Sequence, residues 1–295
     1  MVFVLSHDRQ PLDPTTLQRA DHLLKRGRAA VFRRYPFTII LKDRLAAESV
    51  THAHRVKRDP GSKTTGIAVV AEATGRVVWA GELTHRGQAI RDALVRRKAS
   101  RKGTQTAEEF GHPAIQAQAR RPLKDAAAVN ATRWTLYRRL VATGLPVEVG
   151  TGGRTTFNRM RLGLEKAHWT DAACLGASTP DGLEVRGVQP LLMRATGHGT
   201  RQLCRMARYG FPRTSSKAAR TVHGFRTGDL VRATVTTGKK AGTYCGRVAV
   251  RTSGSFNLTT VGGTVQGLHY RFFTRLHRAD GFTYPGGGAS SHPGS

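Results

Sequence analysis

One acidic residue precedes the most apolar stretch of the N-terminal half. Residues 58–70 read RDPGSKTTGIAVV, so Asp59 ends a short segment and is followed by a glycine-containing turn and an apolar run. A carboxylate at the end of a strand is a ligand for hard cations such as Mg²⁺. An Asp at this place also stabilises a turn by accepting backbone hydrogen bonds. The stretch by itself leaves both roles open.

A second acid, with a histidine beside it, occurs in HWTDAACLGAS at residues 168–178. The pattern predicts a helix, with Thr170 as a candidate N-cap. The i, i+3 spacing then puts His168 and Asp171 on one helical face, where they are candidates for catalysis. The alternatives are an acid that offsets the helix dipole in the first turn and a histidine that packs beside Trp169.

The chain carries a large excess of positive charge. Its 295 residues include 48 Lys and Arg against 19 Asp and Glu, which gives a formal net charge of +29. Such an excess repels itself unless a polyanion neutralises it, and basic side chains that meet phosphates release counterions. Nucleic acid is therefore the expected partner. No apolar run is long enough for a membrane anchor, and we expect no membrane binding.

The three cysteines, Cys174, Cys204 and Cys245, are isolated and form no C-x-x-C pair. This argues against a disulfide framework and fits a reducing cytoplasm.

Several elements in the first third can be predicted from periodicity. Residues 2–5 predict a strand, and Asp13 followed by Pro14 predicts the N-cap and first turn of a helix. The stretch AAVFRRYPFTIIL, residues 29–41, also has strand character. Residues 66–70 and 76–80 predict a hairpin, which with the segment ending at Asp59 makes a three-strand meander.

The rest of the chain mixes helices, loops and short strands. We expect helices over residues 88–102 and 124–144, a strand in LPVEVG at 145–150 and a Gly/Arg loop at 151–160. A basic, turn-rich connector is expected at 181–222. From residue 228 onward, GDLVRATV, GRVAVR, FNLTTV and YRFFTRL alternate with glycine turns. That alternation predicts a small β-barrel.

Taken together, these stretches resemble a known family. PLDP followed by LLKRGRAAVFRRYPFTIIL resembles the opening segment of the transposon-encoded IscB family, whose N-terminal domain is named for a PLMP motif. DPGSKTTGIAVV resembles that family's first RuvC motif, and the run from Lys124 to Ser178 resembles the region around its third. IscB and its relative IsrB are RNA-guided DNA nucleases. The resemblance implies an α/β fold: an incomplete ribonuclease-H-like (RuvC) core, a small α+β N-terminal domain and a C-terminal SH3-like β-barrel.

The resemblance also implies a domain order. We expect a PLMP-type N-terminal domain at 1–50, RuvC part I at 51–87, a truncated arginine-rich bridge helix at 88–102, a remnant of a deleted region at 103–122, RuvC part III at 123–180, the basic connector at 181–222, a β-rich domain at 223–284 that contacts the motif beside the target, and a flexible tail at 285–295.

By motif match, Asp59 and Asp171 correspond to the first and third RuvC carboxylates, which would bind Mg²⁺, and His168 is a further catalytic candidate. Guide RNA and target DNA are the implied partners of a monomer that works in a ribonucleoprotein, in the bacterial cytoplasm and at the nucleoid. The residues expected to contact nucleic acid are all basic: Arg26, Arg28, Arg33, Arg34, Arg96, Arg97, Lys98, Arg101, Arg154, Arg159, Arg161, Lys239, Lys240 and Arg247.

The chain departs from the family pattern after the bridge helix. The sequence has no match to the second RuvC motif, a strand that carries a Glu, or to the HNH domain that follows it. In the strand order 3-2-1-4-5 this removes strand 4 and leaves edges unpaired, unless 145–149 moves across. The strand HRVKRD also brings Lys57 and Arg58 into a position that the family buries, which would be costly.

The loss bears directly on chemistry. Two-metal cleavage needs a carboxylate cluster that holds two cations about 4 Å apart, and only two matched acids remain. Glu148, Glu108 and Glu109 are weaker candidates for a third. The sequence thus leaves open an RNA-guided endonuclease with RuvC-type cleavage and a catalytically dead remnant that still binds nucleic acid. A general basic RNA-binding protein of ribosomal character matches the motifs less well.

Overall fold

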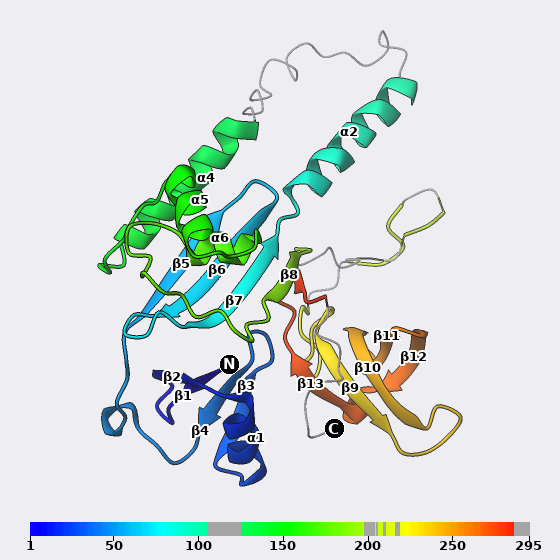
Figure 1. The fold of residues 1–295 in the computed structure, drawn as a ribbon. Helices are drawn as coiled ribbons and strands as arrows, with labels where there is room; N and C mark the ends of the chain where they lie inside the picture. The colour runs from blue at the N-terminus through cyan, green and yellow to red at the C-terminus, as the bar shows by residue number, and fades with distance from the viewer. Residues whose placement is uncertain (105–124, 198–203, 205, 209–210, 216–218, 286–295) are drawn as a thin grey trace. The chain divides into compact units, whose positions relative to one another are not determined.

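The computed structural model describes residues 1–104, 125–197, 204, 206–208, 211–215 and 219–285 (Figure 1). The chain divides into two compact units, residues 1–51 with 196–295 and residues 52–195. Residues 105–122 of the expected remnant, Glu108 and Glu109 among them, and all of the expected tail after residue 285 lie outside the described residues. None of the helices in the described part has the length and apolarity needed to cross a bilayer.

The N-terminal part of the first unit is a small sheet with one helix. Strands β1 (Val2–Leu5), β2 (Pro11–Thr15), β3 (Ala29–Arg33) and β4 (Thr38–Leu41) form it in the order β2-β1-β4-β3, and β1 runs parallel to β4. Helix α1 (Leu17–Lys25) packs on it. Their shared core consists of Val2, Val4, Ala20, Ala29, Ile39 and Leu41. The strand predicted at residues 2–5 is confirmed.

Helix α1 begins later than the sequence predicted. Residues 11–15 form β2 because they pair antiparallel with β1. The N-cap is therefore Thr16, not Asp13: the Thr16 Oγ1 accepts a hydrogen bond from the backbone N of Arg19 at 3.3 Å. The stretch 29–41 forms a hairpin of two strands, β3 and β4, rather than one.

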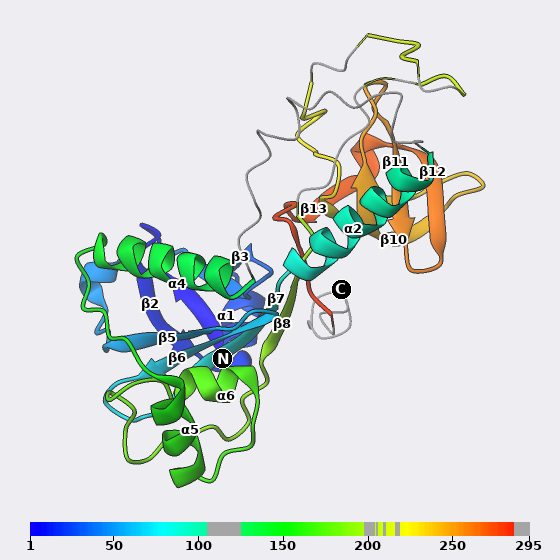
Figure 2. The ribbon, with the colours of Figure 1, turned by 90° about the horizontal axis from the view of Figure 1, so that it is seen from above.

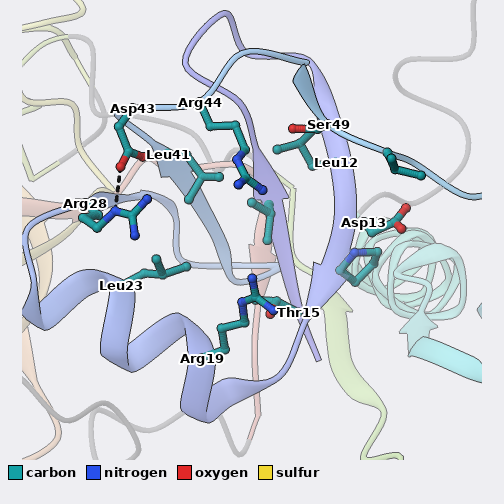
Figure 3. A pocket seen from close by; sticks show the side chains of 13 residues that line it. Leu12, Asp13, Thr15, Arg19, Leu23, Arg28, Leu41, Asp43, Arg44 and Ser49 are labelled. Carbon is teal, nitrogen blue, oxygen red and sulfur yellow. Dashed lines mark hydrogen bonds and ion pairs between the residues drawn. The ribbon is translucent and has the colours of Figure 1, made fainter. Parts of the chain in front are cut away.

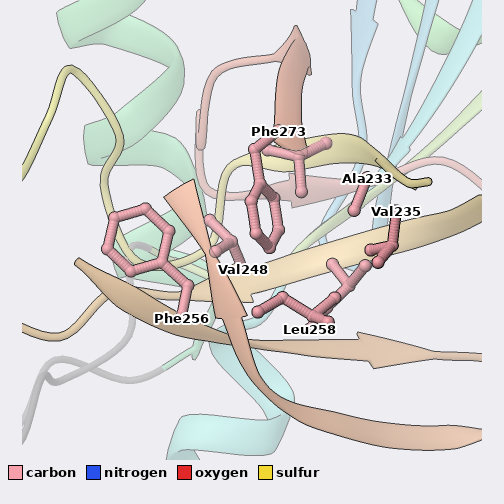
Figure 4. Close-up of a cluster of buried hydrophobic side chains, with 8 residues drawn as sticks. Ala233, Val235, Val248, Phe256, Leu258 and Phe273 are labelled. Atoms are coloured by element: carbon pink, nitrogen blue, oxygen red, sulfur yellow. The ribbon is translucent and has the colours of Figure 1, made fainter. Parts of the chain in front are cut away.

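The C-terminal part of the same unit is an antiparallel sheet of β9 (Leu230–Val235), β10 (Gly242–Ala249), β11 (Ser255–Thr260), β12 (Gly263–His269) and β13 (Phe273–His277); β14 (Phe282–Thr283) follows in the chain but does not belong to this sheet. Its order is β12-β11-β10-β9-β13. Buried aliphatic side chains and Phe256 and Phe273 fill its core (Figure 4). Among the described residues no pairing of β12 with β13 closes the sheet, so the expected barrel is an open sheet here.

The second unit is built on the predicted meander. β5 (His54–Pro60), β6 (Thr64–Ala71) and β7 (Val77–Thr84) are successive antiparallel strands, as expected. β8 (Leu191–Ala195) pairs parallel to β7. The segment 181–222, expected as a basic connector, therefore contains a strand of this sheet at 191–195. Within this unit β5 is an edge strand among the described residues.

The described part of this unit contains four helices: α2 (Gly87–Thr104), α4 (Asp125–Val141), α5 (Gly152–Arg161) and α6 (His168–Ala173). The helices expected at 88–102 and 124–144 are confirmed. Figure 2 shows α5 and α6 on one side of the meander and α4 on the other. The small residues Ala172 and Ala173 let α6 approach the sheet closely, where they share a core with Ala68, Val70 and Ala80.

Two predictions between residues 145 and 161 were wrong. LPVEVG is not a strand, because Glu148 turns to the loop after α6, where its carboxylate accepts hydrogen bonds from the backbone N–H groups of Ala177 and Ser178. The supposed Gly/Arg loop is helix α5. Thr151 caps it by accepting from the backbone N of Arg154, and buried Asn158 anchors it by donating from Nδ2 to Cys174 O at 2.9 Å.

Candidate functional site

Gly66 determines how closely α6 approaches the meander. In the strand register Gly66 of β6 lies opposite Asp59 of β5 on one side and opposite Glu82 of β7 on the other. Directly paired residues of antiparallel strands project from the same face of a sheet. A Cβ at Gly66 would overlap the backbone carbonyl of His168. The first turn of α6 therefore rests on the backbone of β6, between two acids.

This contact brings the three predicted catalytic residues together. Asp59 is half-buried at the end of β5, and its electrostatic neighbours are Asp171, Arg133 and His168. Burial raises the pKa of the Asp59 carboxyl, and the nearby Asp171 carboxylate raises it further, whereas Arg133 and His168 oppose both effects. Two distant segments of the sequence thus meet at one carboxylate pair.

Asp171 is engaged by an arginine. The Arg159 Nε lies 2.9 Å from the Asp171 Oδ1, with both side chains at least four-fifths buried, at 15% and 20% exposed. The same guanidinium donates from Nη1 to the backbone carbonyl of Leu164 at 3.2 Å, which fixes it in place. The carboxylate that the sequence predicted as an Mg²⁺ ligand is therefore already paired with a basic side chain of α5. The sequence prediction assigned Arg159 to nucleic acid instead.

Glu82 was missed by the sequence analysis. Its Oε1 accepts a hydrogen bond from the backbone N of Trp169 at 3.2 Å, at the start of α6. The one sequence signal that could have indicated the contact is Gly66, an isolated glycine in an apolar strand, because such a glycine often marks the close approach of another backbone. Only the register, however, shows that Glu82 stands in one row with Gly66 and Asp59.

The cap of α6 differs from the prediction. The N-cap is Ala167, and Thr170 lies inside the first turn. The Thr170 hydroxyl accepts from the backbone N of Ala167 at 2.9 Å and lies 2.8 Å from Glu165 O, to which it donates. Thr170 thus closes the turn before the helix from within it.

The residues present do not fit a pair of Mg²⁺ ions. No group of three or more His, Cys, Asp or Glu residues with metal-binding geometry occurs in the described ranges. Glu148, considered as a third ligand, is occupied by the backbone N–H groups of Ala177 and Ser178, and its Oε2 lies 3.7 Å from Arg55 Nη1. With Asp171 paired to Arg159, Asp59 is the one matched acid without a basic partner at ion-pair distance among the described residues.

The strand that carries Asp59 also carries a buried lysine. Lys57, two residues before Asp59, is 3% exposed. Its Nζ donates to Leu175 O at 2.9 Å and to Thr179 Oγ1 at 3.0 Å. Burial lowers the pKa of Lys57 to about 8, although Glu148 and Cys174 act against this. The expected cost of burying this lysine is thus reduced by two hydrogen bonds at the end of α6. Burial also lowers the pKa of Arg58.

The comparison with protein families covers the first part of this site. Residues 2–109 match the model described as RRXRR protein. The chain carries an RRXRR domain. This is the N-terminal domain found in IscB-like proteins. The match includes Asp59 and Glu82 but ends before His168 and Asp171. No curated protein is significantly similar to the chain.

The RRXRR domain carries eight of the fourteen residues predicted to contact nucleic acid. Arg96, Arg97 and Lys98 are exposed on α2, and the side chain of Arg101 lies outside the described part. Arg26 and Arg33 are exposed, Arg34 is half-buried, and Arg28 pairs with Asp43, its Nε 2.6 Å from Oδ2.

The residues predicted to contact nucleic acid beyond the RRXRR domain differ in exposure and in whether they already bind other protein groups. Arg154 is exposed, Arg161 pairs with Asp181 at 2.6 Å, and Lys239 is exposed. Lys240 donates to Gln266 O at 2.6 Å. Arg247 is half-buried and donates to the backbone carbonyls of Gly228 and Phe282, so its guanidinium stabilises the C-terminal sheet.

Proposed function

We propose that the chain is an RNA-guided, DNA-binding protein of the IscB type, in which guide binding is retained and RuvC-type cleavage is impaired. The RRXRR domain supports the relation to IscB-like proteins. The net charge of +29 supports a polyanionic partner. The exposed basic residues of α2 and α5 supply phosphate contacts to guide RNA and target DNA, which the protein would meet in the bacterial cytoplasm.

The observation that carries the second half of this proposal is the Arg159–Asp171 ion pair at 2.9 Å. Mg²⁺ in a two-metal site needs several free carboxylate oxygens in octahedral geometry. A guanidinium that is already bound to the third RuvC carboxylate competes for that oxygen. The same guanidinium favours a phosphate group nearby. The site is therefore better suited to binding a nucleic-acid backbone than to hydrolysing it.

An active Mg²⁺-dependent endonuclease is the second candidate. One observation favours it: the pKa of Asp59 is raised by burial and by the Asp171 carboxylate. Acids perturbed in this way cluster at functional sites. A cation between the two carboxylates would relieve their repulsion.

Binding is tested first with RNA sequenced after copurification with the full chain from its native host. Affinity for this RNA should fall steeply from 50 to 300 mM KCl, with a log–log slope near −3 or steeper if four or more phosphates are contacted. Replacing Arg96, Arg97 and Lys98 by Ala should weaken binding about tenfold. Replacing the acid-paired Lys25, Arg55 and Arg76 removes the same charge and should have a smaller effect. A flat salt response would refute the proposal.

Cleavage is then tested on duplex DNA complementary to the guide part of that RNA, with Mg²⁺ or Mn²⁺. We expect binding of the matched duplex with little or no cutting. Cutting that disappears in Asp59→Ala would establish the second candidate instead. Cutting that persists in Asp59→Ala would point to a contaminating nuclease.

A further inference from the structure

The N-terminal sheet holds a cavity of about 330 Å³ that no step of guide binding or cleavage requires. It lies between α1 and strands β1, β2 and β4 (Figure 3). A cavity of this size is at the lower end of small-molecule sites, which typically measure about 300–1,000 Å³. One small ligand would fill it.

One wall of the cavity is apolar and belongs to the core. Val4 and Leu41 are 6% and 8% exposed, and Leu12 and Leu23 are half-buried beside them. The register of β1 with β2 shifts between Val2 and Val4, beside this wall. An apolar wall is best covered by a ligand group that is itself apolar or planar.

The opposite side carries three arginines. Arg19 of α1, Arg28 before β3 and Arg44 after β4 line the cavity, and Figure 3 shows their guanidinium groups directed into it from three sides. Arg28 is matched by Asp43, with Arg28 Nε 2.6 Å from Asp43 Oδ2. Arg19 and Arg44 form no ion pair with any carboxylate in the described part of the chain. Asp13 also lines the cavity, and Asp43 interacts electrostatically with Arg44 as well as with Arg28, so the three arginines of the lining exceed its two carboxylates by one charge.

The combination of charge and wall identifies the class of ligand. Guanidinium groups bind phosphate through paired N–H donors and also stack on the planes of bases. A phosphate alone would leave the apolar wall in contact with water, and an apolar molecule alone would offer no hydrogen-bond acceptor to the guanidinium groups of Arg19 and Arg44. One nucleotide has both parts. A longer oligonucleotide exceeds the volume.

We infer that this cavity binds a single nucleotide, with its phosphate between Arg19 and Arg44 and its base against Leu12 and Leu23. The nucleotide is either free or an unpaired residue of an RNA chain; both present the same chemistry. The inference goes beyond the proposed function and does not depend on it, because a free nucleotide would occupy the cavity whether or not the protein uses a guide.

The test is a calorimetric binding titration of the full chain with 5′-AMP, with inorganic phosphate and with adenosine, all at constant ionic strength. AMP should bind at least about tenfold more tightly than phosphate or adenosine. Arg19→Ala and Arg44→Ala should each weaken AMP binding about tenfold. Lys25→Ala, which removes an exposed positive charge at the end of α1 outside the cavity lining, should change it less than twofold.

Further results test the inference or identify the source of the nucleotide. Phosphate that binds as well as AMP would reduce the site to an anion site and overturn the inference, as would equal losses in Lys25→Ala and Arg19→Ala. If Arg19→Ala unfolds, Arg19→Lys keeps the charge but not the paired donors and should lose affinity while folded. An eight-nucleotide RNA separates the two sources: its binding weakens in parallel with that of AMP if the cavity takes an RNA residue, and is unchanged if it takes a free nucleotide.

Discussion

Gly66 of β6 lies directly beneath the carbonyl of His168, and the absence of a side chain there is what lets α6 reach the carboxylate row. Adding a methyl group should force the helix away, because the group it meets is backbone and cannot change rotamer. We expect Gly66→Ala to destabilise the protein by about 1–3 kcal/mol and to separate Asp171 from Asp59. Denaturant unfolding and Trp169 fluorescence measure both effects.

Gly153→Ala is the matched control for this prediction. A Cβ at Gly153, in α5, meets nothing within 4 Å, and Ala is the better helix former. Its expected effect is neutral to slightly stabilising. Equal destabilisation by the two substitutions would contradict the packing argument.

The Arg159–Asp171 pair makes a prediction about divalent cations. Replacing Arg159 by Gln removes the competing charge and frees the Asp171 carboxylate beside Asp59. The affinity for Mn²⁺ should then rise about tenfold or more, since a unit charge a few ångströms away in a partly buried site contributes more than 1 kcal/mol. Electron paramagnetic resonance of free Mn²⁺ gives the affinity. Arg161→Gln, which breaks the exposed pair with Asp181, should leave it unchanged; a rise in both variants would mean a general charge effect.

Much of the second unit could be predicted because its signals are local. The alternation of residues 54–84 with a glycine turn gives the meander, and the motif around Asp171 gives the helix that faces it. The predicted meeting of Asp59, Asp171 and His168 follows from the motif resemblance and agrees with their electrostatic coupling.

The sequence failed where long-range contacts outweigh local preference. Two glycines argued against a helix at 152–161, but the side chain of Asn158 anchors that helix to the loop after α6. LPVEV has the composition of a strand, yet Glu148 binds backbone N–H groups 29 and 30 residues away instead of pairing in a sheet. Arg159 acts on Asp171, 12 residues further along the chain, and Glu82 acts on Trp169, 87 residues further along, so a window of a few neighbouring residues does not contain their signal.

Glu82 should hold α6 through one hydrogen bond. Glu82→Ala removes the acceptor of the Trp169 N–H and should cost about 1–2 kcal/mol. Glu82→Gln keeps an oxygen at the same place and should cost less than half of that. Urea unfolding measures the difference. Glu72→Ala, which breaks an exposed pair with Arg55, is the control and should cost less than about 1 kcal/mol. Equal losses in the Ala and Gln variants would show that charge, not the hydrogen bond, is what matters.

Lys57 should make the stability depend on pH in an alkaline window. Its pKa falls from 10.5 to about 8 in the folded chain, mainly because of burial. Between these values the unfolded chain binds more protons than the folded one, so stability rises with pH through the window and is lowest below pH 8. Lys57→Met removes this contribution. From pH 8 to pH 10 the wild type should gain about 2 kcal/mol relative to Lys57→Met.

Chemical unfolding at a series of pH values gives this difference directly, and other titrating groups cancel because both proteins contain them. Lys63→Met removes an exposed lysine from the turn of the same meander and should run parallel to the wild type. If Lys57→Met also runs parallel, the lysine is not protonated differently in the two states. Its hydrogen bonds to Leu175 and Thr179 would then fully offset its burial.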